Sequence, residues 1–159
     1  MTDEIFMKKA LCEAQKAFDF NEVPIGAVVV HEGKVIGRGH NKIERRQDPC
    51  AHAEIIAITA AAKKLGTWRL DDCELFVSVE PCLMCLGACF QSRIKRIVFG
   101  TDNIRFGGER YLRVLTEATD SPLSQGAYIR KPEVVGKVLE EECRAVLQAF
   151  FKQIRKPKE

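Results

Sequence analysis

The chain has 159 residues, the length of one ordinary globular domain, of which 46% are hydrophobic and 30% are charged. This composition excludes a disordered protein, and no apolar run approaches the roughly 20 residues of a transmembrane helix, so no membrane partner is expected. The net charge of +3 comes from the last eight positions, which contain four basic residues and one acidic residue. This basic segment could bind a polyanion. It is equally typical of a solvated helix end, because cations near a helix C-terminus interact favourably with the helix dipole.

The cysteine count indicates a reducing compartment. Seven cysteines are present, which is an odd number, and residues 1–6 lack the basic and apolar regions of a secretion signal. We therefore expect a cytoplasmic protein whose thiols are buried or bound to metal rather than paired in disulfides.

The first third of the chain predicts a helix followed by a hairpin. Apolar residues recur at helical spacing over residues 5–18. Two runs rich in β-branched residues, at 23–30 and 34–39, are separated by a short turn and predict paired strands. Residues 40–49 are polar and predict a loop.

From residue 51 onward, predicted helices alternate with predicted strands. The expected elements are a helix at 51–65, a strand at 74–79, a helix at 82–91, a strand at 96–100, a helical turn at 111–115 and a closing helix at about 134–154. This order predicts one α/β domain over residues 1–159, with three α/β/α layers around a central mixed sheet of about five strands.

Two short segments place metal-binding residue types at the starts of predicted helices. His52 lies in the sequence CAHAE at 50–54, and Cys82 and Cys85 lie in EPCLMC at 80–85. A helix start presents unpaired N–H groups and partial positive charge, which stabilise the thiolates that bind metal. Three protein ligands with no second Cys-x-x-Cys predict a zinc site that keeps one position for water, as catalytic zinc sites do.

Glu54 is the candidate proton carrier of this site. It lies two residues after His52, is not needed as a ligand, and can move a proton between water, a ring nitrogen and a leaving amine. Taken singly, the fragments have plainer interpretations, namely a redox pair for Cys-x-x-Cys and a helix cap for the histidine. Together they form the signature of zinc nucleobase deaminases. Cys89 lies one turn beyond Cys85, and we do not expect it to be a ligand, since a fourth protein ligand would close the site.

These segments make the chain resemble the cytidine deaminase superfamily, and most of all the bacterial tRNA-specific adenosine deaminases. The resemblance covers nearly the whole chain. It is carried by EVPIGAV at 22–28, GHN at 39–41, DPCAHAE at 48–54, WRL at 68–70, EPCLMC at 80–85, SRI at 92–94 and FF at 150–151.

The resemblance implies a cytidine deaminase-like fold, one zinc ion per chain and a homodimer. It implies hydrolytic deamination of adenosine to inosine at the wobble position of the tRNA anticodon loop, with the anticodon stem-loop as partner. Asn41 matches a position that contacts the base, as does the backbone of Ala53. Further candidates for the apolar pocket walls, for each of which ordinary core packing is at least as good an interpretation, are Ile25, Leu83 and Phe106. From the closing helix, Phe150 or Phe151 is expected to contribute to the same wall. A basic rim around the site could be supplied by the following residues, each of which singly fits a solvated surface charge better: Arg45, Arg46, Arg93, Lys95, Arg96, Arg105, Lys152 and Arg155.

One stretch departs from the tRNA enzymes. After Gly107 and Gly108 they usually continue with small, glycine-containing sequence, whereas this chain reads ERYL at 109–112. That stretch, with GHN and Asn103, is also similar to fungal cytosine deaminase, and guanine deaminases share the zinc motifs. The alternative function is therefore a salvage deaminase of free cytosine or guanine. A non-catalytic zinc or redox module is a third possibility, which the presence of Glu54 disfavours.

Overall fold

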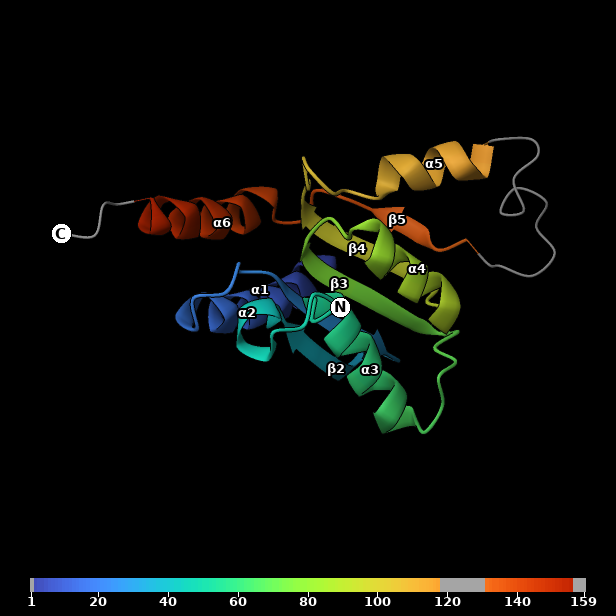
Figure 1. The fold of residues 1–159 in the computed structure, drawn as a ribbon. Helices are drawn as coiled ribbons and strands as arrows, with labels where there is room; N and C mark the ends of the chain where they lie inside the picture. Colours follow the sequence, from blue (N-terminus) through green and yellow to red (C-terminus); the bar gives the residue numbers. More distant parts are fainter. Residues whose placement is uncertain (1, 118–130, 156–159) are drawn as a thin grey trace.

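The computed structural model describes residues 2–117 and 131–155 and confirms the expected α/β class. A five-stranded mixed sheet has the order β2-β1-β3-β4-β5 (Figure 1). Its strands are β1 (Gly26–His31), β2 (Lys34–His40), β3 (Cys73–Val79), β4 (Arg96–Thr101) and β5 (Glu133–Val135). The hairpin β1–β2 and the pair β1–β3 are antiparallel, while β3, β4 and β5 run parallel. The C-terminal ends of β3 and β4 therefore lie side by side at the same end of the sheet.

Helices cover both faces of this sheet, as the three-layer expectation requires. On one face lie α3 (Ala53–Leu65) and α4 (Leu83–Ser92), and on the other lie α1 (Asp3–Asp19) and α6 (Glu140–Ile154) (Figure 1). Two short helices, α2 (Ile43–Arg46) and α5 (Glu109–Glu117), follow the ends of β2 and β4. None of the helices within the described residues is long and apolar enough to cross a membrane.

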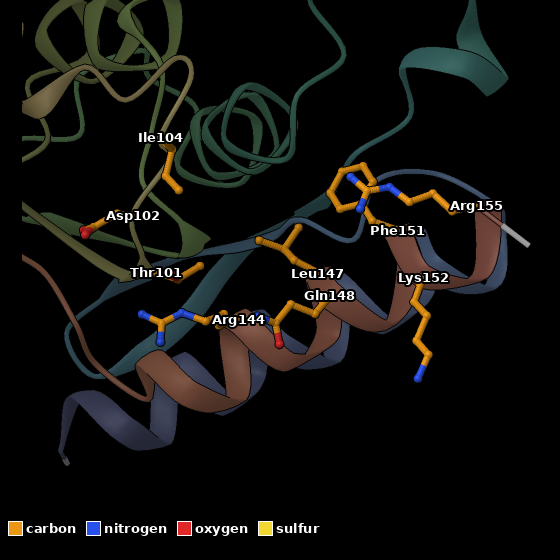
Figure 2. A pocket seen from close by; sticks show the side chains of 9 residues that line it. All are labelled: Thr101, Asp102, Ile104, Arg144, Leu147, Gln148, Phe151, Lys152 and Arg155. Atoms are coloured by element: carbon orange, nitrogen blue, oxygen red, sulfur yellow. The ribbon is translucent and has the colours of Figure 1, made fainter.

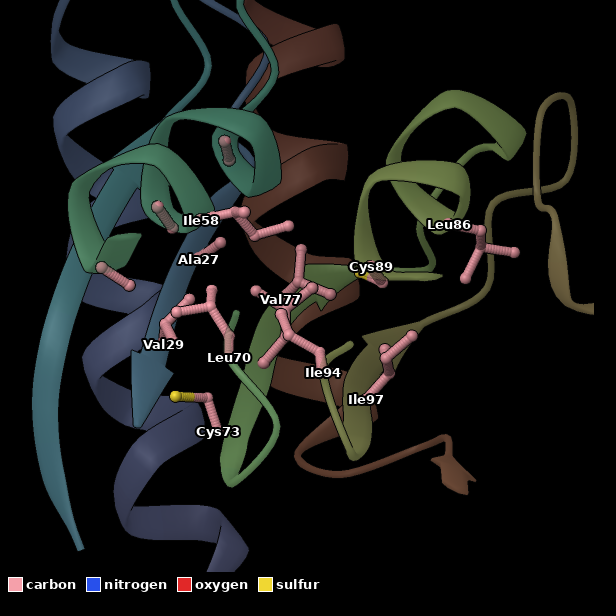
Figure 3. Close-up of a cluster of buried hydrophobic side chains, with 14 of the residues drawn as sticks. Ala27, Val29, Ile58, Leu70, Cys73, Val77, Leu86, Cys89, Ile94 and Ile97 are labelled. Atoms are coloured by element: carbon pink, nitrogen blue, oxygen red, sulfur yellow. The ribbon is translucent and has the colours of Figure 1, made fainter. Parts of the chain in front are cut away.

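Alternate residues of each central strand fill two separate cores. Val29 and Val77 belong to the cluster beneath α3 and α4 (Figure 3), while Val28 and Phe76 belong to the cluster beneath α1 and α6. Because both faces of the sheet are covered, the central strands are continuously apolar rather than alternating with polar residues.

The closing helix is shorter than predicted, and this prediction was wrong at its start. Helix α6 begins at Glu140 rather than near residue 134, and Glu133–Val135 form the edge strand β5. Val134 and Val135 pack on opposite faces of the sheet, as a strand requires, opposite Ile97 and Val98 of β4. Val134 and Val135 are β-branched and Gly136 disfavours a helix interior, which is the physical reason for a strand rather than a helix here.

The polar segment 40–49 also differs slightly from the predicted loop, because it contains the single turn α2. The backbone N–H groups of Glu44 and Arg45, in its first turn, donate to the carboxylate of buried Glu22, at 3.1 and 2.7 Å. A distant carboxylate thus supplies the acceptor that the loop's own sequence lacks.

Candidate metal centre and active site

The three expected metal ligands lie at two neighbouring helix starts. His52 occupies the position before α3 and Cys82 the position before α4, each with an extended backbone. Cys85 lies in the first turn of α4 and is fully buried. Both helices end at a residue with left-handed backbone, Gly66 and Arg93 respectively. Strand β3 ends three residues before Cys82, so the C-terminal end of this central strand determines where the cluster lies.

The ligand atoms lie at the separations that a tetrahedral metal requires. The Nδ1 atom of His52 is 3.6 Å from the Cys82 sulfur and 3.5 Å from the Cys85 sulfur, and the three atoms lie within 4.8 Å of one another. Tetrahedral zinc bonds of about 2.3 Å to sulfur and about 2.0–2.1 Å to nitrogen put these atoms about 3.6 Å apart. The donor set therefore fits zinc. Over residues 2–117 and 131–155, no other group of three such side chains converges in this way.

Hydrogen bonding shifts the pKa values of the two thiols in opposite directions. A bond from the Cys85 thiol lowers the pKa of Cys82 to about 4, with a further contribution from His52. The same contact, together with burial, raises the pKa of Cys85, and the contact with Cys82 raises the pKa of His52. These opposite shifts favour the thiolate form of Cys82 over that of Cys85, and a divalent cation bound to the cluster would favour the thiolate form of both.

Glu54 is a buried acid next to this cluster. It is only 4% exposed, and burial raises its pKa to about 7, against the opposing influence of its backbone and of His52. A carboxyl group with a pKa near neutrality can take up and release a proton at neutral pH, and a cation bound nearby would lower that pKa. Cys89 lies outside the cluster, in the hydrophobic core, where burial raises its pKa.

The loop after β2 places Asn41 close to the start of α3. Asn41 is 4% exposed, and its Nδ2 atom donates to the Val23 carbonyl at 3.3 Å while its Oδ1 atom accepts from the Ile43 backbone at 3.4 Å. Its own backbone N–H donates to the Ile25 carbonyl at 3.0 Å. Each side-chain group makes one such bond, so one donor hydrogen and one lone pair stay available to a ligand.

The other candidate substrate contacts differ in their exposure. Ala53 is fully buried, and Ile25 packs against the core beneath α3 and α4. Leu83 is 51% exposed and Phe106 is 68% exposed, on α4 and on the segment after β4 respectively. Leu83 and Phe106 are therefore accessible to a ligand, whereas Ile25 is half-buried and the side chain of Ala53 packs in the core.

A groove runs along α6, beside the end of β4. It encloses about 800 Å³ and is lined by Thr101, Asp102, Ile104, Arg144, Leu147, Gln148, Phe151, Lys152 and Arg155 (Figure 2). Phe151 faces this groove, whereas Phe150 is buried and packs edge-on against Phe18 at 5.7 Å between ring centroids. Lys156, another basic residue of the tail, lies outside the described residues.

Part of the expected basic rim lies elsewhere. The end of the sheet where β4 begins lies opposite to the metal cluster, and it carries Arg93, Lys95 and Arg96. Each makes an ion pair there, and the bidentate contact of Arg96 with Asp3 has two distances of 2.8 Å. These three residues therefore stabilise the far edge rather than surround the cluster.

Two carboxylates that hold the loops around the site had no role assigned from the sequence. Glu22 binds the segment after β2, and Glu80 binds the segment after β4. Glu22 lies just before an apolar run and Glu80 just after one, and each is close to a proline. This position beside a predicted strand is the sequence feature that could have marked them. Their partners are backbone N–H groups about 20 to 30 positions away, which no residue pattern reveals.

Comparisons with known proteins show that this chain is similar to deaminases. A family model described as MafB19-like deaminase matches residues 1–155. A tRNA-specific adenosine deaminase of Bacillus subtilis (strain 168) is 46% identical over 156 residues, covering 98% of this chain and 92% of that protein. A structure from studies of A-to-I editing by tRNA:A34 deaminases at the wobble position of transfer RNA is 37% identical, with a TM-score of 0.75, and covers 89% of this chain and 98% of that one. The X-ray structure of a guanine deaminase from Bacillus subtilis is 30% identical, with a TM-score of 0.63 and coverage of 100% and 99%.

Proposed function

The chain belongs to the MafB19-like deaminase family, and we propose that it converts adenosine to inosine at the wobble position of a tRNA anticodon loop. The observation that carries the proposal is 46% identity to a tRNA-specific adenosine deaminase over almost the full length of both chains. The cluster of one histidine and two cysteines beside a buried glutamate supports the same chemistry.

We assign zinc to His52, Cys82 and Cys85. When bound, zinc supplies Lewis-acid activation of water at neutral pH. Glu54 takes the proton of the attacking water and delivers it to the ring nitrogen beside the reacting carbon. Glu54 next takes the remaining proton from the hydroxyl that now bonds the reacting carbon and transfers it to the amino group, which leaves as ammonia, so that water and adenosine become inosine and ammonia. Burial keeps Glu54 away from bulk water during these transfers.

The base-binding pocket is assigned to residues on both sides of the cluster. Asn41 and the backbone of Ala53 contact the purine edge, since an amide side chain offers both a donor and an acceptor. The apolar walls are assigned to Ile25, Leu83 and Phe106, and Phe151 borders the outer part of the site from α6. Support comes from the bonds that hold Asn41 in place and from the exposure of Leu83 and Phe106.

We also propose that the protein is a homodimer that packs through α3 and α4. Met84, on the first turn of α4, is 37% exposed, which leaves apolar surface next to the metal ligands. A second copy packed on these helices would cover that surface. Light scattering coupled to size exclusion should give twice the chain mass, and a monomer at micromolar concentration would contradict this assignment.

A panel of substrates tests the function. Purified zinc-loaded protein should form inosine in an anticodon stem-loop with adenosine at the wobble position, and should not turn over free adenine, cytosine or guanine. Guanine deaminase is the second candidate, because a guanine deaminase structure matches the whole chain at 30% identity. Turnover of free guanine without turnover of the stem-loop would replace the tRNA assignment.

A further inference from the structure

Glu80 binds both ends of the segment that connects β4 to α5. Its Oε2 atom accepts the backbone N–H of Asn103 at 2.9 Å, and its Oε1 atom accepts the backbone N–H of Glu109, the first residue of α5, at 3.1 Å. The backbone N–H of Glu80 also donates to the Thr101 carbonyl at 2.8 Å. One carboxylate therefore fixes the span of residues 102–108, which we name the β4–α5 loop.

The β4–α5 loop is further held by its own bonds and by contact with the metal-binding segment. Asn103 accepts two backbone N–H groups, from Phe106 at 3.0 Å and from Gly107 at 2.9 Å. Gly107 forms an isolated antiparallel bridge with Cys82. A side chain at Gly107 would overlap the carboxylate of Glu80, so glycine is required for this approach.

The loop presents apolar side chains to solvent although its backbone is tied down. Ile104 is 88% exposed and Phe106 is 68% exposed. The first half of the loop lines the α6 groove through Asp102 and Ile104 (Figure 2). Its second half contacts the metal-binding segment through the bridge between Gly107 and Cys82. A fixed loop with an exposed aromatic residue beside a base-modifying site suits the stacking of unpaired bases, which is how proteins recognise RNA loops.

We propose that Glu80 is a positioning residue for RNA binding, acting through the β4–α5 loop, which it holds as a rim that places Phe106 at the wall of the base pocket and presents Ile104 to nucleotides flanking the target base. This inference rests on the proposed tRNA substrate. Its two carboxylate oxygens act at opposite ends of the loop, and only a group with two acceptors at this spacing satisfies both N–H donors.

The test compares Glu80→Gln with Glu74→Gln in the zinc-loaded protein. Glutamine has one acceptor oxygen and one donor group, so it cannot accept both backbone N–H groups. Glu74 is the matched control, since it makes ion pairs with Lys95 and Arg96 at the opposite edge of the sheet. We expect Glu80→Gln to retain zinc and to raise KM for the stem-loop about tenfold or more, with a smaller change in kcat. Glu74→Gln should keep both constants.

Amide hydrogen exchange provides a readout that needs no substrate. In Glu80→Gln the amides of Asn103 and Glu109 should exchange faster, while those of Glu44 and Arg45, held by Glu22, should not change. Unchanged exchange at Asn103 and Glu109 would overturn the role of Glu80 in the loop. A fall in kcat with loss of zinc and unchanged KM would show a structural role only, and would also overturn it.

Phe106→Ala keeps the test decisive if Glu80→Gln does not fold. Phe106 is exposed, so its truncation should leave folding intact and still raise KM for the stem-loop. An unchanged KM would remove the loop from RNA recognition. If the parent protein turned over only a free base, the proposed function would fail, while the exchange measurement would still decide whether Glu80 holds the loop.

Discussion

Gly39 on β2 lies directly against the carbonyl oxygen of Ala53, in the first turn of α3. A Cβ atom at position 39 would overlap that oxygen and also approach the backbone N–H of Ala57. Helix α3 can therefore rest on the sheet backbone only where β2 carries glycine. His52 immediately precedes this contact, so the same close approach sets the height of the metal ligand above the sheet.

Replacing Gly39 by alanine should destabilise the protein by about 1–3 kcal/mol, because the helix must move away from the sheet. The displacement begins next to His52, so the affinity for zinc should fall as well. Urea unfolding and a zinc competition titration measure the two effects. Lys34→Ala, at an exposed position of the same strand, is the control and should change stability by less than about 0.5 kcal/mol. A Gly39→Ala protein as stable as the parent would contradict the close approach.

Removing one sulfur ligand should remove the metal. Cys82→Ala should lose its stoichiometric zinc and its deaminase activity, since two remaining ligands bind zinc weakly. Cys89→Ala is the control, because Cys89 lies in the core and outside the cluster. It should retain zinc, with stability lowered by about 1 kcal/mol. Metal analysis of the purified variants decides the matter, and full zinc occupancy in Cys82→Ala would show that another residue completes the site.

Glu54→Gln should keep the fold and the zinc yet lose activity by at least ~10² to 10⁴, the usual contribution of general acid–base catalysis. The amide has nearly the shape of the carboxyl group but cannot carry protons. Single-turnover rates on the stem-loop, with metal content measured in the same sample, test this expectation. Near-normal turnover by the zinc-loaded variant would remove Glu54 from the mechanism.

The α6 groove should contribute phosphate contacts. Lys152→Ala/Arg155→Ala should weaken stem-loop binding and flatten its dependence on salt, by about 0.7 to 0.9 log units per log unit of salt for each lost contact. Lys34→Ala/Lys64→Ala removes the same charge from the start of β2 and from the last turn of α3, and should keep the parent slope. Equal slopes for all three proteins would mean that the end of α6 is only a solvated helix end.

The elements that carry the site could be predicted because their signals are local. The periodicity of residues 51–65 and the apolar run at 74–79 each reflect burial of one short segment, and α3 and β3 lie within two residues of those bounds. The spacing of Cys82 and Cys85 likewise reports a single helical turn, which the structure contains.

Features that depend on distant partners could not be predicted in this way. Strand β5 has only three residues and pairs with β4, and so short a run shows no alternating pattern by which the sequence could identify it. The one-turn helix α2 is stabilised by Glu22, and the β4–α5 loop is held by Glu80, in both cases through backbone N–H groups distant in sequence. Tertiary hydrogen bonds of this kind leave no periodic trace in the chain.

Isotope labelling tests hydrolytic deamination of adenosine in RNA most directly. Zinc-loaded protein is incubated in water enriched in oxygen-18 with a stem-loop carrying one adenosine at the wobble position, and the nucleosides are analysed by mass spectrometry. We predict inosine that carries one solvent oxygen, formed together with one equivalent of ammonia. An unchanged adenosine in the presence of fully loaded enzyme, or inosine without the label, would contradict this account.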